Sequence, residues 1–238
     1  MSLAAAATQA APTGAPMDDD ESARRRGAMV QTQIADRGVR SASVLAAMGR
    51  VVREDFLPAS LRASAYADRP LPIEAGQTLS QPYILARMLE AAEIDAQDRV
   101  LEVGAGSGYS TAVVALLAAR VVAIERHAEL AGLARARLEQ SGHGHVEVHC
   151  ADGSVGWPAA APFDAILVHA AGPEVPEALL GQLAPGGRLV MPVGADRHFQ
   201  HLVKLTRRSA TAYEREVLDA VAFVPLIGAQ GWPEDATG

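Results

Sequence analysis

Apolar residues in the first third of the chain recur at helical spacing. Met29, Val30 and Ile34 share one face of a first predicted helix. Gly38 follows, and it can end that helix in the left-handed conformation. Ser41 can cap a second helix, whose apolar stripe is Val44, Leu45, Met48, Val51 and Val52. Two helices are therefore expected before any strand.

A third helix is predicted after a loop rich in proline and glycine. Ser80-Gln81-Pro82 opens it, because proline suits the first turn of a helix and serine is a favourable cap. Its apolar stripe is Leu85, Met88, Leu89 and Ala92.

From Arg99 onward, short apolar runs alternate with amphipathic helices. The runs are Val100 to Val103, Val121 to Ile124, Val146 to Val148, Ala165 to Val168 and Leu189 to Val193, with a helix through Val113 to Leu117. This alternation is typical of parallel strands joined by crossover helices. Two further strands, at residues 201–206 and 217–226, have no helix between them and are expected to pair antiparallel at the sheet edge. The fold class is therefore α/β, with a mostly parallel, doubly wound sheet.

The chain of 238 residues is expected to form one domain behind a short tail. Residues 1–22 carry almost no large apolar side chains and end in an acidic run, so we expect them to be disordered. Residues 23–238 form the domain. Within it, residues 23–97 hold the N-terminal helices and residues 98–232 the Rossmann-like core.

Composition narrows the classes of function. A net charge of −7 disfavours nucleic acid as a partner, because such binding needs many Lys and Arg contacts to phosphates. Cys150 is the one cysteine, so we expect neither an intrachain disulfide nor a metal site, and a cytoplasmic location. The chain has no apolar run long enough to span a membrane and no secretory signal pattern, so we expect no membrane partner.

A glycine-rich turn lies between the first strand of the core and the next helix, where open parallel sheets bind ligands. Its sequence is Glu102-Val103-Gly104-Ala105-Gly106-Ser107-Gly108-Tyr109. Dinucleotide sites favour G-x-G-x-x-G, whereas these glycines follow E-x-G-x-G-x-G, which resembles class I methyltransferases. The spacing favours S-adenosylmethionine over NAD as the cofactor. The residues expected to bind it are Glu102, Gly104, Gly106 and Gly108. A purely structural turn is the third interpretation.

Acidic residues follow the next two strands. Glu125 comes 21 positions after Gly104, where a carboxylate can accept hydrogen bonds from both ribose hydroxyls. Asp152, followed by Gly153, ends the third strand, where it can bind the amino group of adenine. Either acid alone is more often a helix cap or a solvated loop residue. Three strand ends in register predict a nucleoside cofactor.

The segment Leu71-Pro72-Ile73-Glu74-Ala75-Gly76-Gln77-Thr78-Leu79-Ser80-Gln81-Pro82 resembles the signature of the protein-L-isoaspartate O-methyltransferases. Supporting matches are Arg53 to Phe56, Asp152 to Trp157, Ala161 to Ile166, Pro173 to Pro176, Leu183 to Gly187 and Phe223 to Leu226. The resemblance covers about residues 24 to 232. It implies a Rossmann-like class I methyltransferase fold, with residues 23–97 on the acceptor side.

The resemblance also implies a reaction. The enzyme methylates the free α-carboxylate of L-isoaspartyl residues in proteins and peptides, and the ester then closes to a succinimide whose hydrolysis yields aspartate. Ser80 is implied in the active site, although capping alone would explain a serine there. That carboxylate is already ionised at pH 7, so no general base is needed. Ser80, together with Gln77 or Thr78, should orient it.

Two positions depart from the family pattern. Glu74 stands where glycine is usual, and its charge either repels an anionic substrate or points to solvent, the second being preferred. His169 ends the fourth strand, near the expected acceptor, where a small residue or threonine is usual. It is a candidate substrate-binding residue, and a packed or hydrogen-bonded structural histidine is the alternative.

Three other functions stay open at this stage. A relative with the same fold and cofactor can methylate another carboxylate, such as a normal aspartate or a small acid. A binding module can hold the nucleoside without chemistry. A nicotinamide oxidoreductase is disfavoured by the glycine spacing.

Overall fold

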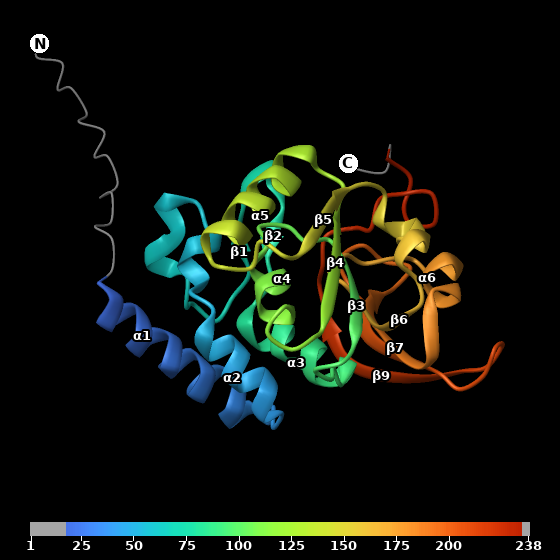
Figure 1. Ribbon diagram of the computed structural model, residues 1–238, viewed down its shortest axis with the longest axis horizontal. Coiled ribbons are helices and arrows are strands. Elements are labelled where there is room, and N and C mark those ends of the chain that lie inside the picture. The colour runs from blue at the N-terminus through green and yellow to red at the C-terminus, as the bar shows by residue number, and fades with distance from the viewer. Residues whose placement is uncertain (1–17, 235–238) are drawn as a thin grey trace, which may run out of the picture.

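The computed structural model describes residues 18–234, which form one seven-stranded sheet covered by helices on both faces (Figure 1). The strand order is β5-β4-β3-β6-β7-β8-β9. The strands are β3 (Arg99–Val103), β4 (Arg120–Glu125), β5 (Glu147–Cys150), β6 (Phe163–Val168), β7 (Leu183–Val193), β8 (Gln200–Arg207) and β9 (Tyr213–Val221). The runs predicted from the sequence fall on these strands except at two ends. Val146 precedes β5, and β9 ends at Val221 rather than at Leu226.

The sheet is parallel from β5 through to β7 and antiparallel beyond it. β3 pairs in parallel with β4 and β6, β4 with β5, and β6 with β7. β8 runs antiparallel to both β7 and β9. The predicted fold class, with its antiparallel edge pair, is confirmed.

Alternate residues of the central strands enter two separate cores. Val100, Val121 and Ala123 belong to the larger core, beneath the N-terminal helices. Leu101 and Val122 belong to the core on the other face. Because both faces of β3 and β4 are buried, the interiors of these strands are apolar instead of alternating with polar residues, except at the buried Glu102.

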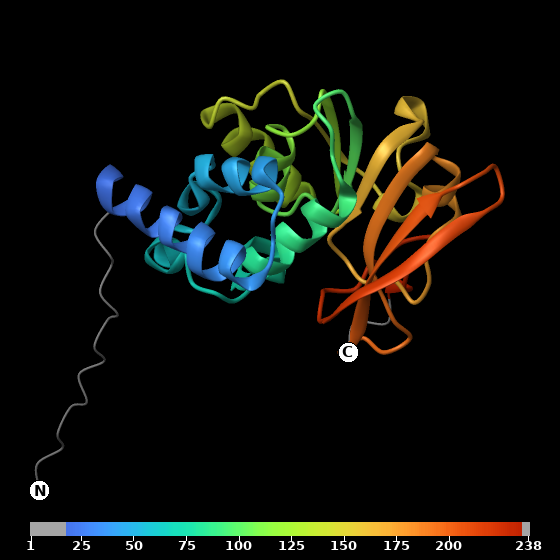
Figure 2. The same ribbon diagram turned by 90° about the horizontal axis from the view of Figure 1, so that it is seen from below.

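The helices are α1 (Asp19–Ala28), α2 (Ala42–Arg50), α3 (Pro82–Ala92), α4 (Tyr109–Val114), α5 (Ala128–Gln140) and α6 (Glu177–Gly181). α1 continues into a π-helical segment, Met29–Ile34, and the chain turns at Gly38 with φ 105°. Ser41 caps α2, as predicted, through a hydrogen bond from the Val44 N–H. α3 contacts β6 and β7, and the first two helices lie outside it (Figure 2).

A small antiparallel hairpin precedes α3. Its strands are β1 (Leu71–Pro72) and β2 (Thr78–Leu79), with Leu71 opposite Leu79. The turn between them contains the short helical segment Glu74–Gly76. This hairpin carries most of the segment that predicted the family.

The predicted end of the tail, at residue 22, is wrong. Asp18 caps α1, its Oδ1 accepting from the Glu21 N–H at 2.7 Å. Ser22 is buried and its hydroxyl donates to Glu54. Polar hydrogen bonds therefore order this acidic stretch, although it has few apolar side chains to bury. Residues 1–17 of the predicted tail lie outside the described residues.

No helix between residues 18 and 234 is long and apolar enough to cross a bilayer.

Arg188 of β7 ties the sheet to the C-terminal end of α3. Its Nε donates to the Ala92 carbonyl at 2.8 Å, and its Nη2 lies 2.8 Å from Asp98 Oδ2. The last carbonyls of a helix have no partner within it, so this guanidinium satisfies one of them. Arg208, by contrast, pairs with Glu214 on the surface.

We therefore expect Arg188→Met to lower the free energy of unfolding by about 2 kcal/mol or more, because it leaves a partly buried carboxylate and a helix carbonyl unpaired. Arg208→Met serves as the matched control and should change it by less than about 0.5 kcal/mol. Urea unfolding of both variants measures the difference. Equal, small effects would contradict this account of the β7–α3 junction.

Candidate active site

The glycine-rich loop leaves β3 in a conformation that only glycine adopts without strain. Gly104, Gly106 and Gly108 have φ of 86°, 54° and 93°. A Cβ on Gly108 would come within 3.3 Å of the Ala134 Cα on α5. A Cβ on Gly106 would lie 3.4 Å from the Ile73 side chain. Backbone conformation and close packing thus both require glycine in this loop.

Glu125, at the end of β4, holds the loop in place. Its Oε2 accepts from the Gly106 N–H at 2.9 Å, and its Oε1 accepts from the His127 N–H at 2.9 Å. The side chain is 5% exposed. Each carboxylate oxygen keeps a further lone pair, so Glu125 can still accept from a ligand.

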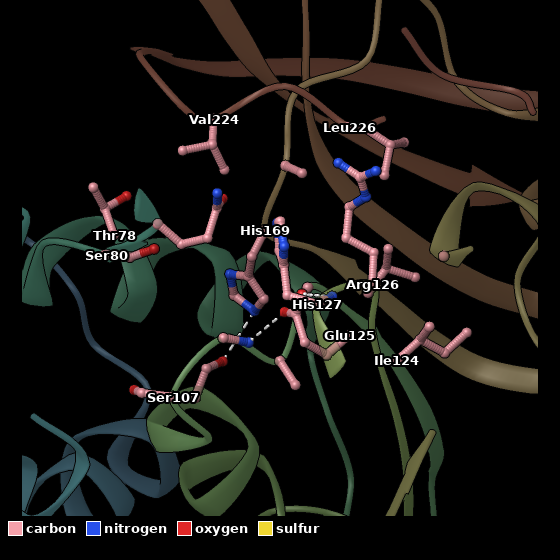
Figure 3. Close-up of a pocket in the computed structure, with 18 of the residues that line it drawn as sticks. Thr78, Ser80, Ser107, Ile124, Glu125, Arg126, His127, His169, Val224 and Leu226 are labelled. Atoms are coloured by element: carbon pink, nitrogen blue, oxygen red, sulfur yellow. Dashed lines mark hydrogen bonds between the residues drawn. The ribbon is translucent and has the colours of Figure 1, made fainter. Parts of the chain in front are cut away.

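A pocket opens at this end of the sheet. It brings together most of the residues predicted for the site, as Figure 3 shows for Thr78, Ser80, Glu125 and His169. Those that line it are Gln77, Thr78, Ser80, Gly104, Gly106, Glu125, Gly153 and His169. The predicted acceptor and cofactor segments therefore face one cavity.

The pocket also has lining residues that the sequence did not single out. They are Leu79, Leu85, Val103, Ala105, Ser107, Ser110, Ile124, Arg126, His127, Ala170 and Val224 to Ile227. Val224 to Ile227 belong to a segment after β9 that returns to the pocket, and Pro225 bridges to Ala171. The sequence ending at Phe223 to Leu226 signalled the family, but its wall position follows only from the fold.

Ser80 is not the cap of α3. That helix begins at Pro82 after Gln81, and no side chain among the described residues caps it. The capping interpretation is therefore wrong, because Ser80 lies one residue too early in the chain. Its side chain lines the pocket.

Arg53 holds the backbone of Ser80 in place through a hydrogen bond. Its Nη2 donates to the Ser80 carbonyl at 2.6 Å, and its Nε donates to the Ala65 carbonyl at 2.8 Å. Arg53 is fully buried, with its guanidinium 4.6 Å from the centre of the Tyr109 ring. Burial lowers the pKa of Arg53 and raises the pKa of Tyr109. In the sequence, Arg53 is only part of a family match, and this supporting role was not predicted.

Glu102 and His169 meet beneath the pocket. Glu102 is fully buried and does not line the cavity, so its predicted direct contact with a cofactor is not what the fold provides. Its Oε1 lies 3.0 Å from His169 Nε2, which is also 2.9 Å from the Ser110 hydroxyl. One nitrogen of His169 is thus occupied by structural partners, while its ring lines the pocket.

Asp152 lines a second pocket next to the first. The two share Arg126 and Ile227. Asp152 Oδ1 accepts from the Ser154 N–H at 2.8 Å, and Oδ2 accepts from the Ala229 N–H at 2.7 Å. Burial raises the pKa of Asp152, but these hydrogen bonds outweigh burial and hold the pKa below its usual value.

Two of the predicted glycines act through packing. Gly108 does not line the main pocket and instead lets α5 approach. A Cβ on Gly153 would lie 2.4 Å from Val103 Cγ1, so glycine is needed there.

Glu74 is held in an ion pair and does not point freely to solvent, which corrects the preferred interpretation of this departure. Its Oε1 lies 2.6 Å from Arg137 Nη2 on α5. Burial raises the pKa of Glu74, but the hydrogen bond and the charge of Arg137, together with a backbone hydrogen bond, outweigh burial and lower the pKa below its usual value. The carboxylate is therefore ionised, and Arg137 compensates its charge, so repulsion of an anionic substrate is reduced.

Comparison with known proteins shows the family of this chain. The sequence model of the protein-L-isoaspartate(D-aspartate) O-methyltransferase family matches residues 24–231. A protein-L-isoaspartate O-methyltransferase of Rhodopseudomonas palustris (strain ATCC BAA-98 / CGA009) is 57% identical over 210 residues, 87% of this chain and 96% of that protein. One of Methylorubrum populi is 57% identical over 206 residues, with coverage of 87% and 96%.

Solved structures agree on the fold. A protein-L-isoaspartate O-methyltransferase superposes with a TM-score of 0.78 at 28% identity, covering 87% of this chain and 67% of that one. A Plasmodium falciparum protein described by the same activity, in complex with S-adenosyl-L-homocysteine, gives 0.74 at 23% identity, covering 85% and 98%. The resemblance predicted from residues 71–82 is confirmed, and the chain belongs to the protein-L-isoaspartate(D-aspartate) O-methyltransferase family.

Proposed function

We propose that this protein transfers a methyl group from S-adenosylmethionine to the free α-carboxylate of L-isoaspartyl residues in proteins and peptides. The ester so formed starts repair through a succinimide. Membership of the family supports this activity. The observation that carries the proposal is that the Gly104–Ser107 loop and the Gln77–Ser80 segment line the same pocket.

The residues on the donor side fit S-adenosylmethionine. Glu125 would bind the ribose hydroxyls, and the glycine loop would approach the methionine portion closely. Asp152, in the adjoining pocket, would accept from the adenine amino group. When bound, this cofactor supplies a methyl group on a sulfonium, which a carboxylate oxygen attacks directly.

The residues on the acceptor side orient an anion that is already reactive. An α-carboxylate is ionised at neutral pH, so the protein has to align it and need not deprotonate it. The Ser80 hydroxyl would donate to one carboxylate oxygen, with Gln77 and Thr78 beside it. Arg53 holds the Ser80 backbone at the required place through its 2.6 Å hydrogen bond.

Apolar side chains keep water from the reacting atoms. The pocket is lined by the apolar side chains of Leu79, Leu85, Val224 and Leu226. Val224 and Leu226 lie in the upper part of Figure 3, across the pocket from Ser107. The segment that carries Val224 and Leu226 is held near Ala171, whose carbonyl accepts a hydrogen bond from the Trp232 indole N–H at 3.1 Å. Excluding water strengthens the electrostatic interactions inside the site.

The proposed partners are isoaspartyl proteins and peptides. The proposed location is the cytoplasm, on the ground that a chain with one cysteine cannot form the intrachain disulfides common outside it.

The activity is tested with a radiolabelled methyl donor and three matched peptides containing isoaspartate, aspartate or no acid. We expect base-labile methyl esters on the isoaspartyl peptide alone, because the pocket binds a free α-carboxylate. Equal labelling of the aspartyl peptide would indicate another carboxylate methyltransferase. Failure to label any peptide, with donor binding intact, would indicate a binding module.

Ser80→Ala should lower kcat by about 10- to 100-fold, the effect of losing one hydrogen bond to a charged group. Because Ser80 does not cap α3, the free energy of unfolding of the variant and its affinity for S-adenosylhomocysteine should equal those of the wild-type protein. The control is Ser41→Ala, which removes a real cap and should cost about 1 kcal/mol of stability without loss of turnover. A Ser80 variant that is unstable yet fully active would refute the assignment.

The role of Asp152 is tested by comparing S-adenosylhomocysteine with its inosine analogue, which lacks the amino group. Wild-type protein should favour the adenosine compound by about tenfold or more, and Asp152→Ala should lose that preference. Glu125→Gln should weaken both compounds by the same factor, because both have the same ribose. Calorimetry gives the ratios, and a preference retained in Asp152→Ala would exclude this contact.

A further inference from the structure

The turn that carries the acceptor segment has a strained backbone. Ala75 and Gly76 have consecutive positive φ values of 54° and 67°. The Gln77 N–H donates to the Glu74 carbonyl at 3.2 Å, which closes a tight turn of the mirror-image type. Glycine or asparagine usually occupies the first of the two central positions, whereas here it is alanine. Such a conformation persists only where its surroundings enforce it.

An ion pair holds Glu74, the first residue of this turn, in place. Arg137 Nη2 lies 2.6 Å from Glu74 Oε1, and its Nη1 lies 3.4 Å from Oε2, so the guanidinium faces both carboxylate oxygens. The two side chains are 13% and 22% exposed. Partial burial reduces screening by solvent, so this pair is stronger than one on the open surface.

Arg137 belongs to α5, the helix that also packs against the glycine-rich cofactor loop after β3. Ala134 of α5 lies against Gly108, and Arg137 follows three residues later on the same face of the helix. Ile73, just before the turn, packs against Gly106. α5 therefore contacts the cofactor loop at one point and the acceptor turn at the next.

We propose that the Glu74–Arg137 ion pair positions the acceptor segment against the cofactor loop, and thereby sets the affinity for the isoaspartyl peptide. Both residues are positioning residues, because they act through Gln77, Thr78 and Ser80. This inference rests on the proposed function. It also assigns a use to Glu74, which departs from the glycine usual in the family.

The test is a charge-reversal cycle with Glu74→Arg, Arg137→Glu and the two changes combined. Each single variant should raise KM for the isoaspartyl peptide by about tenfold, with a smaller change in kcat, because it releases the turn. Affinity for S-adenosylhomocysteine should stay within about twofold of wild type. The combined variant should recover most of the lost peptide affinity, because the pair re-forms with exchanged charges.

Arg120→Glu is the matched control. Arg120 pairs with Glu147 at 2.7 Å on the surface at the other end of β4, so its reversal should leave KM unchanged. If the effect of Glu74 came from its own charge, Glu74→Arg would bind the anionic peptide more tightly. That result, or a combined variant no better than either single one, would overturn the proposal.

Hydrogen exchange separates this inference from the proposed function. In Arg137→Gln, the amides of Ile73 and Gln77, which donate across the turn, should exchange at least about tenfold faster than in wild type. The amides of β4 should be unchanged. This readout needs no substrate, so unchanged exchange at Ile73 and Gln77 rejects the ion pair as a clamp. Wild-type protein that labels no isoaspartyl peptide rejects the proposed function instead.

Discussion

The site depends on how closely its neighbours approach the glycine loop after β3. Side chains at Gly104, Gly106 and Gly108 would lie within 3.5 Å of His169, of Ile73 and of Ala134 respectively. These three neighbours come from the end of β6, the acceptor hairpin and α5. Positive φ at all three glycines gives the loop the course around which these three distant parts of the chain meet. Both pockets lie beside this junction.

The N-terminal helices build the acceptor side of the pocket, which the sheet alone would leave open. The segment after α2 supplies Arg53, whose buried guanidinium is bonded to the Ser80 carbonyl and lies against the Tyr109 ring. A buried cation is costly unless its hydrogen bonds are made, so Arg53 restricts the backbone around it to few conformations. Ser80, which lines the pocket, is positioned in this way.

The sequence predicted the strands of the sheet, but not which way the carboxylates on and after them point. Runs such as Val121 to Ile124 are visible because burial on both faces leaves no polar residue in them. Glu102, Glu125 and Asp152 were each predicted to contact the cofactor. Glu125 lines the main pocket, Asp152 lines the adjoining pocket, and Glu102 is buried beside His169. A strand end indicates where the backbone of an acidic residue lies. The direction of its side chain depends on hydrogen-bond partners from other strands and loops.

The sequence by itself determined the order of elements, the glycine loop and the family, because local periodicity and short motifs carry that information. The tertiary structure decided the roles of individual side chains. Ser80 faces the pocket because α3 begins two residues later, at Pro82, and Glu74 is paired because α5 brings Arg137 within 2.6 Å of it. Such contacts join residues about 60 positions apart, and no local pattern encodes the distance between them.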